Sequence, residues 1–254
     1  MLIDFMSNTY FQFKEFIVHQ ERAAMKVSTD SCLFGSWVAN RISNRNKEDS
    51  QIEKAKSVSR ILDIGTGTGL LLLMLAQKIE AELEGIELDK GAFADAENNI
   101  LASVWKDRIR LISGDVLQYS FTSKYELIIS NPPFYENSLK SDLAERNQAK
   151  HDEALTLRSL VKVVDMLLDE AGIFAVMIPT FRREELLNYT SEIDLYLIES
   201  MDVLNIEGGK PIRTCFLFGR KKVEMIQTSL IIRDSTQQYT SEFKKLLQDY
   251  YLYL

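Results

Sequence analysis

Residues 60–69 read RILDIGTGTG. The short apolar run Arg60–Ile64 predicts a buried strand, and the glycines that follow it predict a tight turn. Residues 70–78 (LLLLMLAQK) are strong helix formers, so a helix should follow the turn directly. A strand, a glycine turn and a helix in this order indicate the start of a β-α-β unit, in which helix amides can face a ligand.

The alternation of strands and helices continues along the chain. Further strands are expected at 82–88, 108–112, 125–130 and 172–178, with helices at 91–104 and 154–170 and a closing strand pair at 195–204 and 214–219. This order favours an α/β fold built on a mostly parallel, seven-stranded sheet with helices on both faces.

Composition limits the kinds of function that the chain can have. The net charge is -7, so any surface that binds nucleic acid must be a local basic patch on an acidic body. Two cysteines, Cys32 and Cys215, and two histidines provide no metal-ligand spacing, so we expect no metal and a reducing cytoplasm. Residues 1–4 (MLID) lack the basic start of a signal peptide, and no apolar run is long enough to cross a membrane.

The glycine loop predicts a nucleoside-type cofactor. Gly65, Gly67 and Gly69 let a ligand approach the backbone, and Asp63 precedes them. Glu87 ends the next expected strand, where its carboxylate can accept bonds from ribose hydroxyls. The spacing is G-x-G-x-G rather than the G-x-G-x-x-G of dinucleotide sites, and it resembles the first motif of Rossmann-like methyltransferases. An ordinary glycine turn is the plain alternative.

A second motif, Asn131-Pro132-Pro133-Phe134, follows the strand expected at 125–130. The prolines stiffen the backbone and leave carbonyl groups free, while Phe134 can stack on a flat group. The Asn131 side-chain oxygen and the Pro132 carbonyl can accept both hydrogens of a planar amino group and direct its lone pair at a methyl donor. Taken alone the motif could be a proline loop, but the two motifs together resemble the amino-methyltransferases.

The N-terminal segment resembles one family within that class, the bacterial tRNA1(Val) (adenine-N(6))-methyltransferases. The resemblance covers nearly the whole chain and includes the string FQFKEFIV at 11–18, MKV at 25–27, Thr29-Asp30 and a tail with IIR at 231–233. It implies a class I methyltransferase that uses S-adenosylmethionine and methylates the adenine beside the anticodon of a valine tRNA. By pattern alone, the phenylalanines at 11, 13 and 16 predict a half-buried strand rather than a platform for stacked bases.

The resemblance also implies roles for single residues. Asn131, Pro132, Pro133 and Phe134 would hold the target amino group, and the cofactor would contact Asp63, Gly65, Gly67, Gly69, Glu87, Asp115, Thr29 and Asp30. Asp115 would accept from the cofactor's adenine, although a Gly-Asp pair after a strand is often only a turn. Basic side chains expected to contact RNA are Lys14, Arg22, Lys26, Arg213 and Lys221.

We therefore expect one methyltransferase domain over 1–254, with an N-terminal extension and linker (1–58), a catalytic core (59–222) and a C-terminal tail (223–254). The protein should act as a cytoplasmic monomer. Three alternatives stay open: a ribosomal-RNA adenine methyltransferase, a release-factor glutamine methyltransferase, and an RNA-binding scaffold without catalysis. A DNA methyltransferase would need a recognition domain that this length hardly permits.

Overall fold

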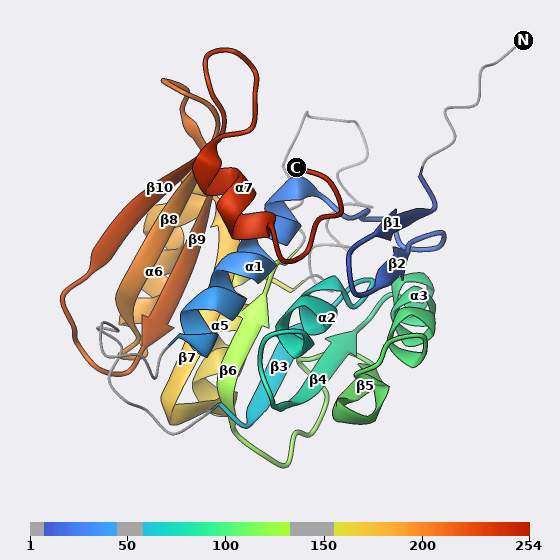
Figure 1. Ribbon diagram of the computed structural model, residues 1–254. Coiled ribbons are helices and arrows are strands. Elements are labelled where there is room, and N and C mark those ends of the chain that lie inside the picture. Colours follow the sequence, from blue (N-terminus) through green and yellow to red (C-terminus); the bar gives the residue numbers. More distant parts are fainter. Residues whose placement is uncertain (1–7, 45–57, 133–154) are drawn as a thin grey trace, which may run out of the picture.

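The computed structural model describes residues 8–44, 58–132 and 155–254 (Figure 1). Its strands are β1 (Tyr10–Gln12), β2 (Ile17–His19), β3 (Arg60–Ile64), β4 (Glu82–Glu87), β5 (Ile109–Ser113), β6 (Tyr125–Ser130), β7 (Leu168–Pro179), β8 (Tyr196–Ile206), β9 (Pro211–Gly219) and β10 (Ile226–Arg233). Its α-helices are α1 (Thr29–Ser43), α2 (Leu70–Ala76), α3 (Lys90–Leu101), α5 (Leu157–Leu167), α6 (Arg183–Ser191) and α7 (Ser241–Leu247). Short 3-10 turns lie at Lys106–Arg108 and Thr180–Arg182.

The central sheet has the order β10-β8-β9-β7-β6-β3-β4-β5, and β1 and β2 form a separate hairpin. All neighbours in the central sheet are parallel except at β9, which is antiparallel to both β7 and β8. The mostly parallel sheet and the closing strand pair are therefore confirmed.

The expected number of seven strands was wrong, because the described residues form a sheet of eight. The additional strand is β10, which lies in the segment interpreted as a tail and pairs in parallel with β8. Only Leu230 and Ile232 of this strand are buried. An edge strand with so few buried positions gives a weak apolar alternation in the sequence, so it was missed.

The helix expected at 154–170 is shorter than predicted. Thr156 caps its start by accepting from the amide of Ser159, and α5 ends at Leu167. The chain then runs extended from Leu168, which pairs with Tyr125 of β6 before the register shifts. Tertiary pairing with a neighbouring strand thus overrides the helical pattern of residues 168–170.

Alternate residues of the strands face two separate apolar clusters. In β7, Ile173, Ala175 and Met177 pack into the cluster that contains α1, α2 and α7, whereas Phe174 and Val176 pack into the cluster with α5 and α6. Figure 1 shows α1 and α7 in front of the sheet and α5 and α6 behind it. Helices on both faces are therefore confirmed.

The N-terminal segment belongs to the core of the molecule. Helix α1 packs against α2, where Gly35 leaves room for Met74: a Cβ at this position would lie 2.7 Å from the Met74 sulfur. Phe13 and Phe16 are buried, and their rings stack with 4.6 Å between the centroids, so they are core residues rather than exposed stacking platforms. Among the described helices, none is long and apolar enough to cross a membrane.

Candidate active site

The glycine loop leaves an open cradle at the carboxyl end of β3. Gly65, Gly67 and Gly69 all have positive φ, at 72°, 58° and 79°, a conformation that side chains with a Cβ rarely adopt. A Cβ added to Gly65 or Gly67 would meet nothing within 4 Å. The backbone therefore needs glycine for its conformation, and the space above the loop is free for a ligand.

Asp63 lies beneath this cradle with one carboxylate oxygen unsatisfied. Its side chain is fully buried, and Oδ2 accepts from the Thr66 hydroxyl at 2.6 Å. Oδ1 has no hydrogen-bond partner in the described part of the chain. The pKa of Asp63 is raised to about 7 in total. Burial raises it most, the hydrogen bond from Thr66 lowers it, and the charge of Glu87 raises it. A buried oxygen without a donor is expensive unless a ligand supplies one, so Asp63 fits a group that carries a cation or an N–H.

Glu87 connects the end of β4 to the glycine loop. Its Oε2 accepts from the amide of Gly67 at 2.7 Å, and its Oε1 accepts from the amide of Asp89 at 2.8 Å. A carboxylate can accept about four hydrogen bonds, so both oxygens keep capacity for ribose hydroxyls. The contact with the cofactor that the sequence led us to expect stays a prediction.

Asp115 follows β5 at the same edge of the sheet. Its Oδ1 accepts from the amide of Leu117 at 2.9 Å, and its Oδ2 accepts from the Gln118 side chain at 3.0 Å. Both oxygens therefore stabilise the local turn. This is the plain alternative that the sequence left open, and a contact with a cofactor would have to use their remaining lone pairs.

Asn131 follows β6 directly, next to the end of β3. The Ser130 hydroxyl donates to the carbonyl of Ile64 at 2.8 Å and so fixes the end of β6 to the start of the glycine loop. The Asn131 Nδ2 donates to the hydroxyl of Ser31 at 2.9 Å. With its nitrogen held in this way, the carboxamide directs Oδ1 away from Ser31. Pro132 is buried beside it, whereas Pro133 and Phe134 lie outside the described residues.

Thr29 and Asp30 form the first turn of α1, which Ser28 caps by accepting from the amide of Ser31. Asp30 forms an ion pair with Arg213 at 3.5 Å. Burial raises the pKa of Asp30, and the Arg213 charge opposes this. Both Thr29 and Asp30 line a hollow beside the ends of β8 and β10, so the structure places them on the opposite side of Asn131 from Glu87.

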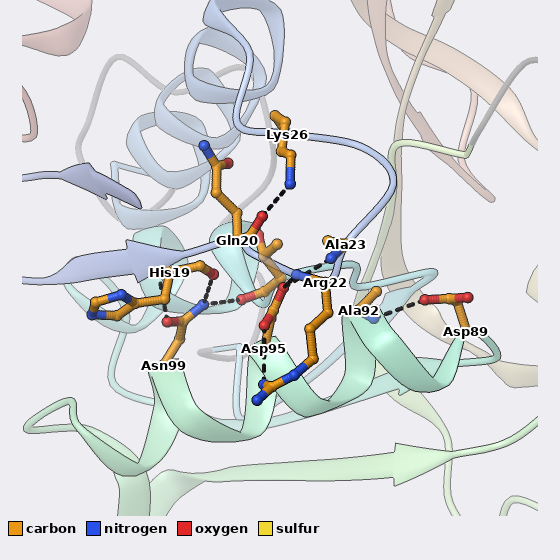
Figure 2. A network of polar contacts seen from close by, with 10 residues as sticks. His19, Gln20, Arg22, Ala23, Lys26, Asp89, Ala92, Asp95 and Asn99 are labelled. Atoms are coloured by element: carbon orange, nitrogen blue, oxygen red, sulfur yellow. Dashed lines mark hydrogen bonds and ion pairs between the residues drawn. The ribbon is translucent and has the colours of Figure 1, made fainter. Parts of the chain in front are cut away.

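A polar network fastens the N-terminal segment to the glycine loop (Figure 2). Asn99 of α3 accepts from the amide of His19 and donates to its carbonyl, both at 2.8 Å, and it also donates to the carbonyl of Thr68 at 3.0 Å. Asp95, one turn earlier, accepts from the amides of Arg22 and Ala23 at 2.8 Å each. Because Thr68 belongs to the glycine loop, α3 holds this loop and the segment that leads to α1 together.

Sequence reasoning missed Ser31, Asp95 and Asn99. Asp95 and Asn99 are polar residues spaced four apart on a helix, and both are buried. That spacing was a usable signal, because it places two hydrogen-bonding side chains on one helix face. Ser31 gave none, since its partner is 100 positions away in the chain.

The basic residues expected to contact RNA are not gathered on one face. Lys14 Nζ donates to the carbonyl of Gln248 at 2.6 Å, Lys26 Nζ donates to the carbonyl of Gln20, and Arg22 lies 3.4 Å from Asp95. Arg213 lies near the start of β9, at the edge of the sheet where β7 ends, whereas Lys221 follows the end of β9 at the opposite edge. Lys221 is thus separated from Asn131 by the length of a strand.

The described residues hold no group of three or more histidine, cysteine or acidic side chains that could bind a metal ion.

Comparisons with known proteins identify the fold and the family of the chain. Residues 50–187 match the family model of the methyltransferase small domain. Two solved structures share the fold: a protein from Agrobacterium tumefaciens described as a predicted O-methyltransferase (TM-score 0.60, 14% identity, covering 83% of this chain and 95% of that one), and the glycopeptide N-methyltransferase MtfA in complex with S-adenosylmethionine (TM-score 0.51, 12% identity, covering 74% and 94%).

Relatives of known description align over nearly the full length. The tRNA1(Val) (adenine(37)-N6)-methyltransferase of Bacteroides thetaiotaomicron is 37% identical over 98% of this chain and 100% of its own. The enzyme of the same name from Pectobacterium carotovorum is 36% identical over 96% and 94%. With this identity over both full lengths, the chain belongs to the tRNA1(Val) (adenine(37)-N6)-methyltransferase family.

Proposed function

We propose that this protein transfers a methyl group from S-adenosylmethionine to the N6 amino group of an adenine in tRNA1(Val), the adenine at position 37 that its relatives' names specify. The observation that carries the proposal is Asn131, whose carboxamide is fixed by Ser31 and stands next to the start of the glycine loop. An RNA adenine thus has a hydrogen-bond acceptor beside a site for a nucleoside-type cofactor.

The residues at the carboxyl ends of β3 and β4 fit the cofactor. The unsatisfied Oδ1 of Asp63 suits the donors of a positively charged amino group, and the open cradle above Gly65 and Gly67 admits a ligand against the backbone. Glu87 can accept from the ribose hydroxyls. When bound there, S-adenosylmethionine supplies an electrophilic methyl group on a sulfonium.

The chain's own residues prepare the amino nitrogen. The lone pair of an adenine amino group is delocalised into the ring, so the nitrogen is a weak nucleophile. Hydrogen bonds to Asn131 Oδ1 and to the Pro132 carbonyl favour the tetrahedral nitrogen and direct its lone pair outward. S-adenosylmethionine held by the glycine loop, Asp63 and Glu87 would supply the methyl group to this lone pair and would leave as the neutral thioether. The nitrogen then loses one proton to water, so no strong base is needed.

Asn131→Ala tests this chemistry. We expect turnover to fall by about two orders of magnitude or more, as for the loss of a group that stabilises developing charge. The affinity for S-adenosylmethionine should stay near that of the wild type, because the side chain acts on the target nitrogen. Near-normal turnover would show that the motif only ends a strand here.

The substrate test offers unmodified tRNA1(Val), ribosomal-RNA fragments and a release factor to the same preparation, with radiolabelled cofactor. We expect label in the tRNA alone, and nucleoside mass spectrometry should find N6-methyladenosine. Label only in the release factor would contradict the RNA reading and leave a general amino-methyltransferase. Label in none, with cofactor bound, would favour a scaffold. We further propose that the protein acts in the cytoplasm and that it is a monomer. Size-exclusion chromatography with light scattering can check the monomeric state.

A further inference from the structure

A hollow of about 640 Å³ lies at the edge of the sheet formed by the carboxyl ends of its parallel strands. It is on the side of Asn131 that faces away from the glycine loop. Its walls include the first turn of α1 (Thr29 and Asp30), the end of β8 (Asn205), the end of β10 (Arg233) and the turn that follows β10 (Gln237 and Tyr239). None of its lining residues belongs to the glycine loop or to residues 131–132.

Strand directions place this hollow next to the reacting position. Strand β9 is antiparallel to both β7 and β8, so β8 and its parallel neighbour β10 run in the same direction as β6 and β7. The carboxyl ends of all four strands therefore lie at one edge, with Asn131 between the glycine loop and the hollow. Asp30 lines the hollow, and the next residue, Ser31, contacts Asn131.

Arg233 presents a fixed positive charge in this hollow. Its guanidinium lies over the ring of Tyr239, 4.3 Å from the centroid, and Tyr239 stacks on the buried Phe243 at 4.4 Å. Arg233 Nη1 also donates to the carbonyl of Gln237 at 2.6 Å. Across the described ranges no carboxylate forms an ion pair with Arg233, whereas Arg213 nearby is paired with Asp30. The remaining donors of the guanidinium suit an anion.

Hydrogen bonds within the turn after β10 stabilise its conformation. Asp234 Oδ1 accepts from the amides of Thr236 and Gln238 at 2.8 and 3.0 Å, so its charge is engaged within the turn. Gln237 has a φ of 66°, which is costly for a side chain with a Cβ and is stabilised by the bond from its amide to the Asp234 carbonyl at 3.0 Å. These contacts support the wall of the hollow that carries Arg233 without any ligand.

We propose that this hollow binds a nucleotide of the substrate RNA next to the target adenine, with Arg233 contacting its phosphate. The inference rests on the proposed function and names a second subsite for the same RNA. Bases of a single-stranded loop are already partly unstacked, so a neighbour of the extruded adenine can enter a separate hollow. Asn205 and Gln237 bring amide donors and acceptors that can pair with a base edge.

Arg233→Ala is the principal test, with Lys222→Ala as a matched control. Lys222 also lies over a tyrosine ring, at 4.8 Å from the centroid of Tyr196, but at the opposite edge of the sheet. We expect Arg233→Ala to raise the dissociation constant for tRNA1(Val) about tenfold, as for the loss of a charge-assisted hydrogen bond. The slope of log affinity against log salt should fall by about 0.7, the loss of one single-strand phosphate contact. The dissociation constant of Arg233→Lys should lie between those of the wild type and Arg233→Ala, and that of Lys222→Ala should match the wild type.

Three further readouts separate the possible failures. Cofactor affinity and the thermal unfolding midpoint of Arg233→Ala should stay at wild-type values, which excludes misfolding. If Arg233→Ala binds tRNA with the same affinity and salt slope as the wild type, and the wild type methylates tRNA, the subsite proposal is wrong and the proposed function stands. A wild-type protein that neither binds nor methylates tRNA would overturn both proposals. Finally, 4-thiouridine placed beside the target adenine should crosslink to residues 205–213 or 233–239, and a crosslink confined to other peptides would contradict the placement.

Discussion

Asp63 combines complete burial with a free carboxylate oxygen, and this makes stability depend on pH. Its pKa is raised to about 7, whereas in the unfolded chain it is near 3.8. The folded state therefore holds the proton more tightly, and the stability that this contributes is fully present below about pH 4 and is lost as the pH rises through about 7. As the pH rises across that range, urea unfolding should show the unfolding free energy of the wild type falling relative to that of Asp63→Asn. Parallel pH curves would contradict the assignment.

Glu87 accepts from the loop amide of Gly67, and the proposed function gives it a second partner in the ribose hydroxyls of the cofactor. We expect Glu87→Ala to weaken S-adenosylmethionine binding by about 1.5–3 kcal/mol, because charge-assisted hydrogen bonds are lost. Glu82→Ala, an exposed position at the start of the same strand, is the control and should bind normally. Calorimetry on both variants decides, and unchanged affinity in a folded Glu87→Ala would remove Glu87 from the site.

Ser31 fixes the orientation of the Asn131 carboxamide through its hydroxyl. We expect Ser31→Ala to reduce turnover about ten- to hundredfold, because a misplaced reacting group costs rate steeply. Cofactor affinity should be unchanged, and Ser31→Thr, which keeps the hydroxyl, should recover much of the rate. Ser43→Ala in the last turn of the same helix is the control. Equal rates for alanine and wild type would show that Asn131 needs no support.

At the scale of elements, α3 connects the N-terminal segment and the cofactor loop through Asn99. We expect Asn99→Ala to lower the unfolding free energy by about 2–3 kcal/mol, because buried backbone groups of His19 and Thr68 lose their partner. It should also weaken cofactor binding, since Thr68 belongs to the glycine loop. Asn98→Ala, exposed on the same helix, should do neither. Chemical denaturation and calorimetry check both effects, and a destabilised variant with full cofactor affinity would limit Asn99 to folding.

The elements near the glycine loop were predictable because local patterns suffice there. Strands β3 and β6 were predicted with the bounds that the structure gives. Each is an apolar run followed by a residue that ends a strand, Gly65 after β3 and Pro132 after β6. β10 and the early end of α5 were not predictable, because pairing with β8 and with Tyr125 decides them. For the site, the sequence indicated Asp63, Glu87 and Asn131. Ser31 and Arg233 became visible only when the fold brought distant segments together.

At the scale of the whole molecule, the two ends of the chain secure each other. The amide of Lys14 donates to the carbonyl of Tyr250 at 2.8 Å, and Phe13 bridges to Tyr251. Tyr250 is fully buried, and its hydroxyl donates to the carbonyl of Met74 in α2 at 2.9 Å. The hairpin of β1 and β2 is thus held by the C-terminal segment on one side and by Asn99 on the other, as Figures 1 and 2 show together.

This double attachment predicts that the two fastenings are coupled. Tyr250→Phe should cost about 1 kcal/mol, the loss of one hydrogen bond, and Tyr250→Ala about 3–5 kcal/mol, because a large buried side chain is removed. Tyr253→Ala, at a position 89% exposed, should have almost no effect. Combined with Asn99→Ala, Tyr250→Ala should cost less than the sum of the two, since a hairpin already released on one side has less to lose on the other. Strict additivity in urea unfolding would show that the ends act independently. In that case the C-terminal segment stabilises α2 alone and does not support the segment that leads to Ser31.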